Sequence, residues 1–338
     1  MYGEWKIEDC QGREVLFLDV RSPKEYEDAH IPGAVNLPLL DDEERAVVGT
    51  LYVQGDIEEA KRQGVLFVSQ KFPAMMEEIF RLTREHKDLV IYCARGGYRS
   101  RSLFHLLRHG MDVPVSRLEG GYKAYRKFVR EGLEERIAKH HFIVLDGMTG
   151  CGKTEILEEL QDLGARVLDL EGLANHRGSL LGGVGLGDQP SQKQFESALF
   201  DALEGEEGPI FTEGESMRIG SLLLPKSLHE KMRKSIRLRI DAPMECRVAR
   251  IREEYVKEGN DEEILRALHS LGRYVNPKRL LAMEEKFRNQ EVDSLIEELM
   301  TSYYDPKYRL GTEVEKTYTN RDSKACAEEI WRDYGPHL

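Results

Sequence analysis

The chain of 338 residues has few cysteines, fewer basic than acidic residues, and no long apolar run. Its five cysteines include no pair spaced as CxxC, and their number is odd. We therefore expect neither a disulfide framework nor a zinc site, and the pattern indicates a reducing compartment. The cysteines are Cys10, Cys93, Cys151, Cys246 and Cys326.

The sequence also lacks the excess of positive charge that is typical of proteins with a large nucleic-acid-binding surface. Acidic residues number 61 and basic residues 49, which gives a net charge of −12. RNA binding would therefore depend on local basic clusters. No apolar run approaches the roughly 20 residues of a membrane helix. The stretch MYGEWKIEDC does not have the basic region and apolar core of a signal peptide. We expect a cytoplasmic protein with no membrane partner.

Short apolar runs alternate with amphipathic segments along the chain, which predicts an α/β fold with parallel sheets. The length suits two domains, which we place at residues 1–135 and 136–338. The charged helical segment 131–140 would connect them, and the region 244–300 is helical in pattern. Strands are expected at 15–19, 34–37, 89–92, 115–118, 142–145, 166–169, 209–212 and 236–240, and helices at 73–86 and 100–109.

The segment YCARGGYRS, residues 92–100, places one cysteine between an apolar run and a helix. Backbone N–H groups in such a turn converge on one point, and the helix N-terminus adds its positive dipole end, so both favour a thiolate at Cys93. Two arginines would add forked donors for a tetrahedral anion, and two glycines would allow positive φ angles close to it. We name these four residues the anion cradle: Arg95, Gly96, Gly97 and Arg99.

Two other interpretations of this loop stay open. A free cysteine is commonly a buried structural thiol. The spacing from Cys93 to Arg99 is also the Cys-x5-Arg spacing of cysteine phosphatases. A phosphatase would need an acid to protonate its leaving group, and the sequence near the loop offers no clear candidate.

A second glycine-rich segment, GMTGCGKT at residues 147–154, matches the pattern GxxxxGK[ST] between an apolar run and a helix. Its backbone amides would bind a diphosphate or triphosphate, and Lys153 would pair with the terminal oxygens. The Thr154 hydroxyl would hold a magnesium ion if one is used. Glu213 is either a second acidic ligand or a solvated loop carboxylate. We name residues 147–154 the phosphate loop; its predicted binding residues are Gly147, Gly150, Gly152, Lys153 and Thr154.

Several stretches carry a resemblance to known families. DVRSPKEY (19–26), HIPGAVNLP (30–38) and YCARGGYRS resemble the signature of rhodanese domains. Beyond them, HRGS (176–179), residues 189–196 and 213–220, and YDPKY (304–308) resemble the tRNA 2-selenouridine synthase family. The resemblance covers roughly residues 10–320. It implies a rhodanese-like parallel-sheet domain followed by a P-loop NTPase-like α/β domain with a helical C-terminal region.

The resemblance also implies an activity. Members of this family act on 2-thiouridine at the wobble position, in the anticodon arm of certain tRNAs. They transfer a geranyl group from geranyl diphosphate to the sulfur, and then replace geranylthiol with selenium from selenophosphate. Cys93 would be the nucleophile and could hold selenium as a selenyl-sulfide, the anion cradle would bind selenophosphate, and the phosphate loop would bind the diphosphate. No tightly bound cofactor is expected, and no metal site is certain.

The sequence leaves the apolar slot for a geranyl chain and the RNA-binding surface open. Leu180–Leu181 and Leu222–Leu224 are slot candidates, although ordinary core packing is the favoured interpretation of each. The basic clusters at 99–101, 123–130 and 226–239 are candidates for RNA contact, or else solvated helix faces. Rival readings of the chain are an ATP-dependent kinase or ATPase fused to a sulfurtransferase, and a non-catalytic sulfur-carrier or anion-sensing module. No clear guanine-recognition motif is present, so a GTPase is disfavoured.

Overall fold

The computed structural model describes residues 2–179, 181–257, 259–307 and 314–335. Residues 1–133 with 196–200 form one compact unit, and residues 134–195 with 201–338 form a second. The predicted slot residue Leu180 and the motif residue Tyr308 lie outside the described residues. All five cysteines are free thiols. No helix in the described ranges is long and apolar enough to cross a bilayer.

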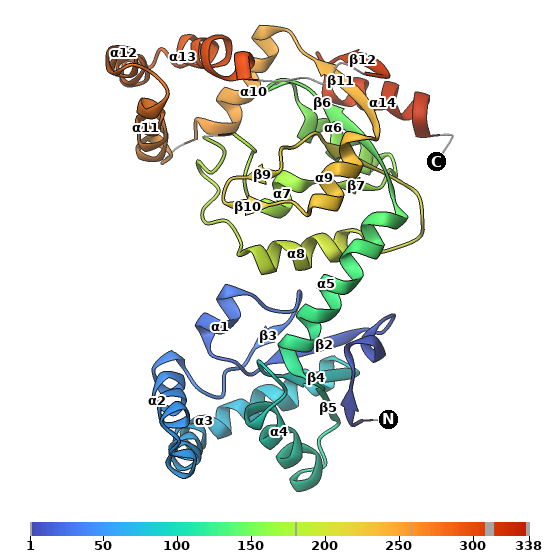
Figure 1. Ribbon diagram of the computed structural model, residues 1–338, viewed down its shortest axis with the longest axis vertical. Coiled ribbons are helices and arrows are strands. Elements are labelled where there is room, and N and C mark those ends of the chain that lie inside the picture. The colour runs from blue at the N-terminus through green and yellow to red at the C-terminus, as the bar shows by residue number, and fades with distance from the viewer. Residues whose placement is uncertain (1, 180, 258, 308–313, 336–338) are drawn as a thin grey trace. The chain divides into compact units, whose positions relative to one another are not determined.

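The first unit is built on a five-stranded parallel sheet in the order β1-β5-β4-β2-β3 (Figure 1). Because the strands are parallel, the carboxyl ends of β2 and β4 meet at one edge, and Asp19 pairs in register with Tyr92 there. Cys93 follows directly. The strands are β1 (Glu4–Trp5), β2 (Val15–Asp19), β3 (Val35–Asn36), β4 (Asp88–Tyr92) and β5 (Val115–Leu118).

Helices pack against this sheet through a continuous apolar core that includes Leu18, Ile79, Ile91 and Leu103. Helix α1 begins after Ser22 as its N-cap and has a proline at its first helical position. The helices are α1 (Pro23–Asp28), α2 (Asp42–Gln54), α3 (Ile57–Glu85), α4 (Tyr98–His105) with a π-helical turn at Leu106–Gly110, and α5 (Gly121–Lys139).

Two helix predictions in this unit were wrong in their bounds. Helix α3 runs straight through Pro73, where we expected a helix to begin. Pro73 removes one hydrogen bond to the carbonyl of Ser69, but that residue is exposed, so water can replace the lost donor. Helix α4 begins at Tyr98 instead of Ser100. The expected connector is the second half of the continuous helix α5.

The second unit has its own five-stranded parallel sheet, in the order β12-β11-β6-β8-β7. The edge strand β12 was not predicted, because its four residues KTYT are mostly exposed and too short to show a pattern. A small antiparallel pair, β9 (Arg218–Ile219) and β10 (Leu222–Leu223), lies apart from it. The sheet strands are β6 (His141–Asp146), β7 (Val167–Leu168), β8 (Pro209–Glu213), β11 (Ile236–Asp241) and β12 (Lys316–Thr319).

Two groups of helices in this unit have an apolar core. Helices α6 and α14 pack on the sheet around an apolar core that contains Ile156, Phe211 and Ile330. Helices α10 to α13 form a separate helical region with its own core, as the sequence predicted (Figure 1). The helices are α6 (Lys153–Asp162), α7 (Leu170–Ala174), α8 (Gln192–Ala202), α9 (Lys226–Arg233), α10 (Met244–Tyr255), α11 (Asp261–Ser270), α12 (Pro277–Arg288), α13 (Val292–Leu299) and α14 (Ser323–Tyr334).

Candidate active sites

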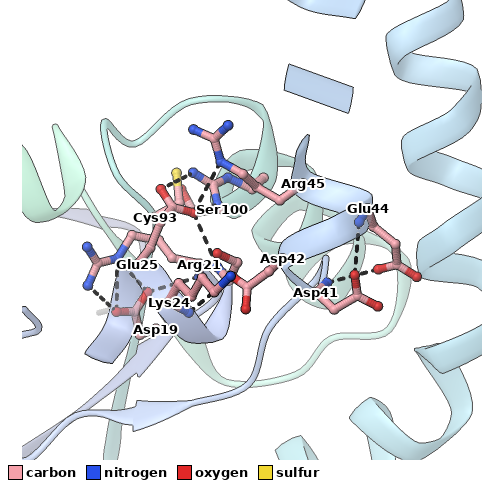
Figure 2. A network of polar contacts seen from close by, with 12 residues as sticks. Asp19, Arg21, Lys24, Glu25, Asp41, Asp42, Glu44, Arg45, Cys93 and Ser100 are labelled. Carbon is pink, nitrogen blue, oxygen red and sulfur yellow. Dashed lines mark hydrogen bonds and ion pairs between the residues drawn. The ribbon is translucent and has the colours of Figure 1, made fainter. Parts of the chain in front are cut away.

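Cys93 lies at the carboxyl end of β4, where the chain turns into α4. Its side chain is buried, with 3% of its surface exposed. The Cys93 sulfur lies 3.1 Å from the hydroxyl oxygen of Ser100, on the first turn of α4 (Figure 2). The thiol therefore sits at the base of the loop and beside the N-terminus of a helix, as the motif predicted.

The loop after Cys93 is fastened by the N-terminus of α5. The amides of Tyr122 and Lys123 donate to the carbonyls of Cys93 and Ala94 at 2.8 and 3.0 Å. Gly121 makes this approach possible because its φ is +59° and an added Cβ would lie 2.1 Å from the Cys93 carbonyl oxygen. Gly121, which follows Gly120 at the start of α5, thus shapes the cysteine loop directly.

Arg117 contacts the candidate site, and the sequence analysis missed it. It lies in β5, its side chain is 3% exposed, and its guanidinium donates to the Gly96 carbonyl at 2.6 Å. The same group pairs with Glu4. A basic residue inside the buried run VSRL was the available signal, because an arginine is rarely buried without a partner. Arg117 therefore holds the backbone of the anion cradle at Gly96.

The two arginines of the anion cradle are placed differently. Arg95 is exposed and forms no ion pair or hydrogen bond with the described residues. Arg99 is half-buried and donates to both carboxylate oxygens of Glu25, at 2.5 and 3.1 Å. Burial raises the pKa of Glu25, but the hydrogen bonds from Arg99 outweigh it, so the net pKa is lowered. Arg45 also approaches Glu25, at 3.8 Å (Figure 2).

The glycines of the cradle are also unlike each other. Gly96 has a φ of +61° and packs closely against Gly120. Gly97 was expected to adopt a positive φ as well, but its φ is −86° because it is the N-cap residue of α4. Only the first glycine therefore requires its special backbone freedom. The role of the four cradle residues in anion binding stays a prediction.

Below the loop, Asp19 and Arg21 form a buried ion pair with a shortest distance of 2.6 Å. The Arg21 guanidinium also donates to the Ala29 carbonyl at 2.7 Å and lies 4.2 Å from the centre of the Tyr122 ring. Burial opposes the charged guanidinium, but the hydrogen bond to Asp19 raises the pKa of Arg21 overall. These contacts join the ends of β2 and α5, and so support the base of the cysteine loop.

The phosphate loop lies between β6 and α6, as predicted. Gly150 and Gly152 have φ angles of +75° and +85°, and an added Cβ at Gly147 would lie 2.5 Å from the Ile240 carbonyl. The loop carbonyls are held from outside. The Arg247 Nε donates to Thr149 at 2.9 Å, and the Asn320 side chain donates to Cys151 at 2.9 Å. Arg247 in turn makes a two-pronged ion pair with Asp305, at 2.6 and 3.0 Å.

A polar pocket adjoins the phosphate loop, and Thr154 is part of its wall. Lys153 donates from Nζ to the Gly147 carbonyl at 3.3 Å. The Glu171 and Glu215 carboxyls interact with each other and with this lysine. Burial, and then the Glu215 charge, raise the pKa of Glu171 to about 8. The sequence analysis did not single out these carboxyls as a pair, because they meet only in the folded unit.

Glu213 is 2% exposed at the end of β8, so the solvated-carboxylate reading is wrong. Its Oε1 accepts from the Glu171 amide at 2.7 Å. Burial, and then the neighbouring charges of Asp169 and Glu171, raise its pKa. Its role as a metal ligand stays a prediction. No cluster of three or more histidine, cysteine or acidic side chains suited to a metal ion occurs within the ranges that the structure describes.

A second cavity adjoins the phosphate loop at Thr149, and its wall is almost wholly apolar. Leu181, one of the predicted slot residues, is part of it, whereas Leu222 and Leu224 are buried elsewhere. Thr149, Ser179, Ile251 and Tyr255 line both this cavity and the polar pocket. Most of the remaining wall comes from α11 to α13, including Leu268, Phe287, Leu295 and Leu299, and from Met300 in the turn after α13.

Known proteins resemble both units. Residues 4–128 match the rhodanese-like domain family, and residues 140–276 match the tRNA 2-selenouridine synthase AAA domain. A Marinobacter nauticus protein named tRNA 2-selenouridine synthase is 35% identical over 87% of this chain and 88% of its own length. A Pseudomonas fluorescens protein of the same name is 34% identical over 98% and 97%.

Among solved structures, the N-terminal domain of a Clostridium difficile 630 protein described as ATP/GTP binding is 44% identical. The match covers 37% of this chain and 97% of that one, with a TM-score of 0.36. The predicted fold class, with a rhodanese-like unit, a P-loop unit and a helical C-terminal region, is confirmed by the family matches. The long relatives extend the likeness over nearly the whole chain, and the chain belongs to the tRNA 2-selenouridine synthase family.

Proposed function

We propose that this protein converts wobble 2-thiouridine in tRNA to 2-selenouridine in two steps, one at each candidate site. The names of its relatives support the overall conversion. The observation that supports the two-step route is the apolar cavity that shares four wall residues with the polar pocket of the phosphate loop. A polar site for diphosphate joined to an apolar cavity suits a diphosphate with a hydrocarbon tail, such as geranyl diphosphate.

In the first step, the thiouridine sulfur attacks C1 of geranyl diphosphate. A sulfur–carbon bond forms, the carbon–oxygen bond breaks, diphosphate leaves with the electron pair, and the uridine N3 proton is released to solvent. The phosphate loop amides and Lys153 would stabilise the negative charge that develops on the leaving oxygen. No ATP hydrolysis is required. A magnesium ion on Thr154, if used, would supply further charge stabilisation.

In the second step, selenium from selenophosphate replaces the alkylated sulfur at C2 of the uridine. The carbon–selenium bond forms, the carbon–sulfur bond breaks, and geranylthiolate leaves. Alkylation makes the sulfur a far better leaving group than a thiocarbonyl. Selenium enters and leaves at the oxidation level of selenide, so no external oxidant is needed. We assign the donor to the anion cradle, with Cys93 as the nucleophile toward its phosphorus. The sulfur–phosphorus bond forms, the phosphorus–selenium bond breaks, and selenide leaves to attack C2 of the uridine. Water then hydrolyses the cysteinyl phosphate to phosphate and the free thiol.

Nucleoside mass spectrometry tests this function. The protein is mixed with a 2-thiouridine anticodon stem-loop, geranyl diphosphate and selenophosphate, and the digested nucleosides are weighed. We expect a geranylated nucleoside, followed by a product with selenium in place of sulfur. Cys93→Ser should abolish the selenium step and keep geranylation, whereas Lys153→Ala should weaken geranylation.

Equal loss of both steps in Cys93→Ser would contradict the division between the sites. Unchanged 2-thiouridine, with all components active, would overturn the function. ATP turnover under those conditions would instead support the kinase and sulfurtransferase fusion.

A further inference from the structure

The Ser100 hydroxyl is held against the Cys93 sulfur in the interior of the first unit. Ser100 has 0% of its surface exposed and Cys93 has 3%. Their oxygen and sulfur atoms are 3.1 Å apart, well within hydrogen-bonding range for sulfur. In the described part of the chain, Cys93 is the hydrogen-bond partner of this hydroxyl. Serine on the first turn of a helix usually bonds to backbone or water, so this placement is specific.

We propose that Ser100 is a positioning residue, whose hydroxyl donates to the Cys93 thiolate and so sets the charge and direction of the nucleophile. A thiolate has no proton to give, so the hydroxyl must be the donor once Cys93 is ionised. A buried anion without a donor is costly. The role of Cys93 as nucleophile rests on the proposed function, whereas the hydrogen bond itself does not.

The charges around the loop explain why this hydroxyl matters. Arg99, the cradle arginine nearest to a helix N-terminus, is already paired with Glu25. It therefore gives the thiolate less support than a free guanidinium would. The helix N-terminus and the Ser100 hydroxyl are not neutralised in this way, so they can stabilise the Cys93 thiolate. The other charged groups at this edge of the unit are Arg95, Arg45, the Asp19–Arg21 pair, and the Arg117–Glu4 pair.

Ultraviolet titration of the thiolate tests the proposal without any substrate. Each variant is compared with the same variant carrying Cys93→Ser, so that the other four cysteines cancel. Because a hydrogen bond to a charged group contributes about 1.5 kcal/mol or more, Ser100→Ala should raise the midpoint by about one pH unit. Ser102→Ala, at an exposed position of the same helix, should leave it unchanged.

A second pair guards against misfolding of the alanine variant. Ser100→Thr keeps the hydroxyl, and Ser100→Val has nearly the same shape without it. Both carry the same extra methyl group, so the difference between them isolates the hydroxyl. We expect the thiolate of the valine variant to titrate about one pH unit above that of the threonine variant, a tenfold difference in proton affinity. Equal Cys93 titration midpoints in the folded threonine and valine variants would overturn the proposal, even if the protein proves to modify 2-thiouridine. If the midpoints shift as expected but the protein does not modify tRNA, only the proposed function is overturned.

Discussion

Glu25 and Arg99 form a two-pronged ion pair next to the cysteine loop, with N–O distances of 2.5 and 3.1 Å. The carboxylate comes from α1 and the guanidinium from α4, 74 residues apart. Glu25 also caps α1 through the Ser22 amide, at 3.2 Å. A cradle arginine is thus neutralised by the protein itself, so an incoming anion must compete with Glu25 for it.

Glu25→Gln should therefore tighten anion binding at the cradle. Removing one negative charge beside Arg99 changes a half-buried interaction by about 1 kcal/mol, which predicts roughly fivefold stronger binding. Calorimetric titration with inorganic phosphate would measure it, in a Lys153→Ala background that weakens the phosphate loop. Glu27→Gln removes the same charge from an exposed position of α1. An equal effect of both variants would show that only net charge matters.

Gly121→Ala should disrupt the cysteine loop. The positive φ costs about 1 kcal/mol for any side chain, and the added Cβ would also collide with the Cys93 carbonyl at 2.1 Å. We expect a loss of stability of about 2 kcal/mol or more and loss of the selenium step. Gly12→Ala is the matched control, because its φ is +68° and its Cβ would meet nothing within 4 Å. If urea denaturation showed equal losses in the free energy of unfolding for the two variants, the predicted collision would be contradicted.

Asp305→Asn should loosen the phosphate loop. Asp305 holds the buried Arg247, which holds the Thr149 carbonyl. Weakening this largely buried pair should cost about 1–3 kcal/mol and reduce affinity for inorganic diphosphate. Asp293→Asn weakens the Arg252–Asp293 pair, in which both side chains are more than half exposed, so it should cost less than about 1 kcal/mol. Unchanged diphosphate affinity in Asp305→Asn would refute the link.

Glu171 should make the protein less stable as pH rises. Its pKa is about 8 in the folded protein, against an ordinary value of 4.5. Between these values the folded state keeps a proton that the unfolded chain has lost, so the free energy of unfolding falls with increasing pH. Glu171→Gln should flatten this decline from about pH 5 to 8, as followed by urea denaturation at each pH. Glu158→Gln, at an exposed position in the same pocket, should keep the wild-type slope.

The sequence predicted the elements that depend on short contiguous patterns. The strand and helix on either side of each glycine-rich loop are visible as an apolar run and an amphipathic segment. This is why β4 and β6 lie close to their expected bounds and a helix, α6, follows the phosphate loop as expected. Prediction from the sequence failed where the local pattern and the surrounding structure favour different elements. Pro73 looked like a helix start, but the apolar face of α3 continues on both sides of it. The short edge strand β12 had too little apolar content to be recognised.

By itself, the sequence determined where the two glycine-rich loops lie and which residues are predicted to hold the chemistry, because a thiol beside glycines and arginines and a GxxxxGKT loop are local features of the chain. Only the tertiary structure decided how those residues are supported and charged. Glu25 pairs with Arg99, Arg117 holds Gly96, and Glu171 meets Glu215 across long stretches of sequence. The apolar cavity likewise exists only because α10 to α13 fold against the phosphate loop. Such contacts depend on packing between distant segments, and no local pattern encodes them.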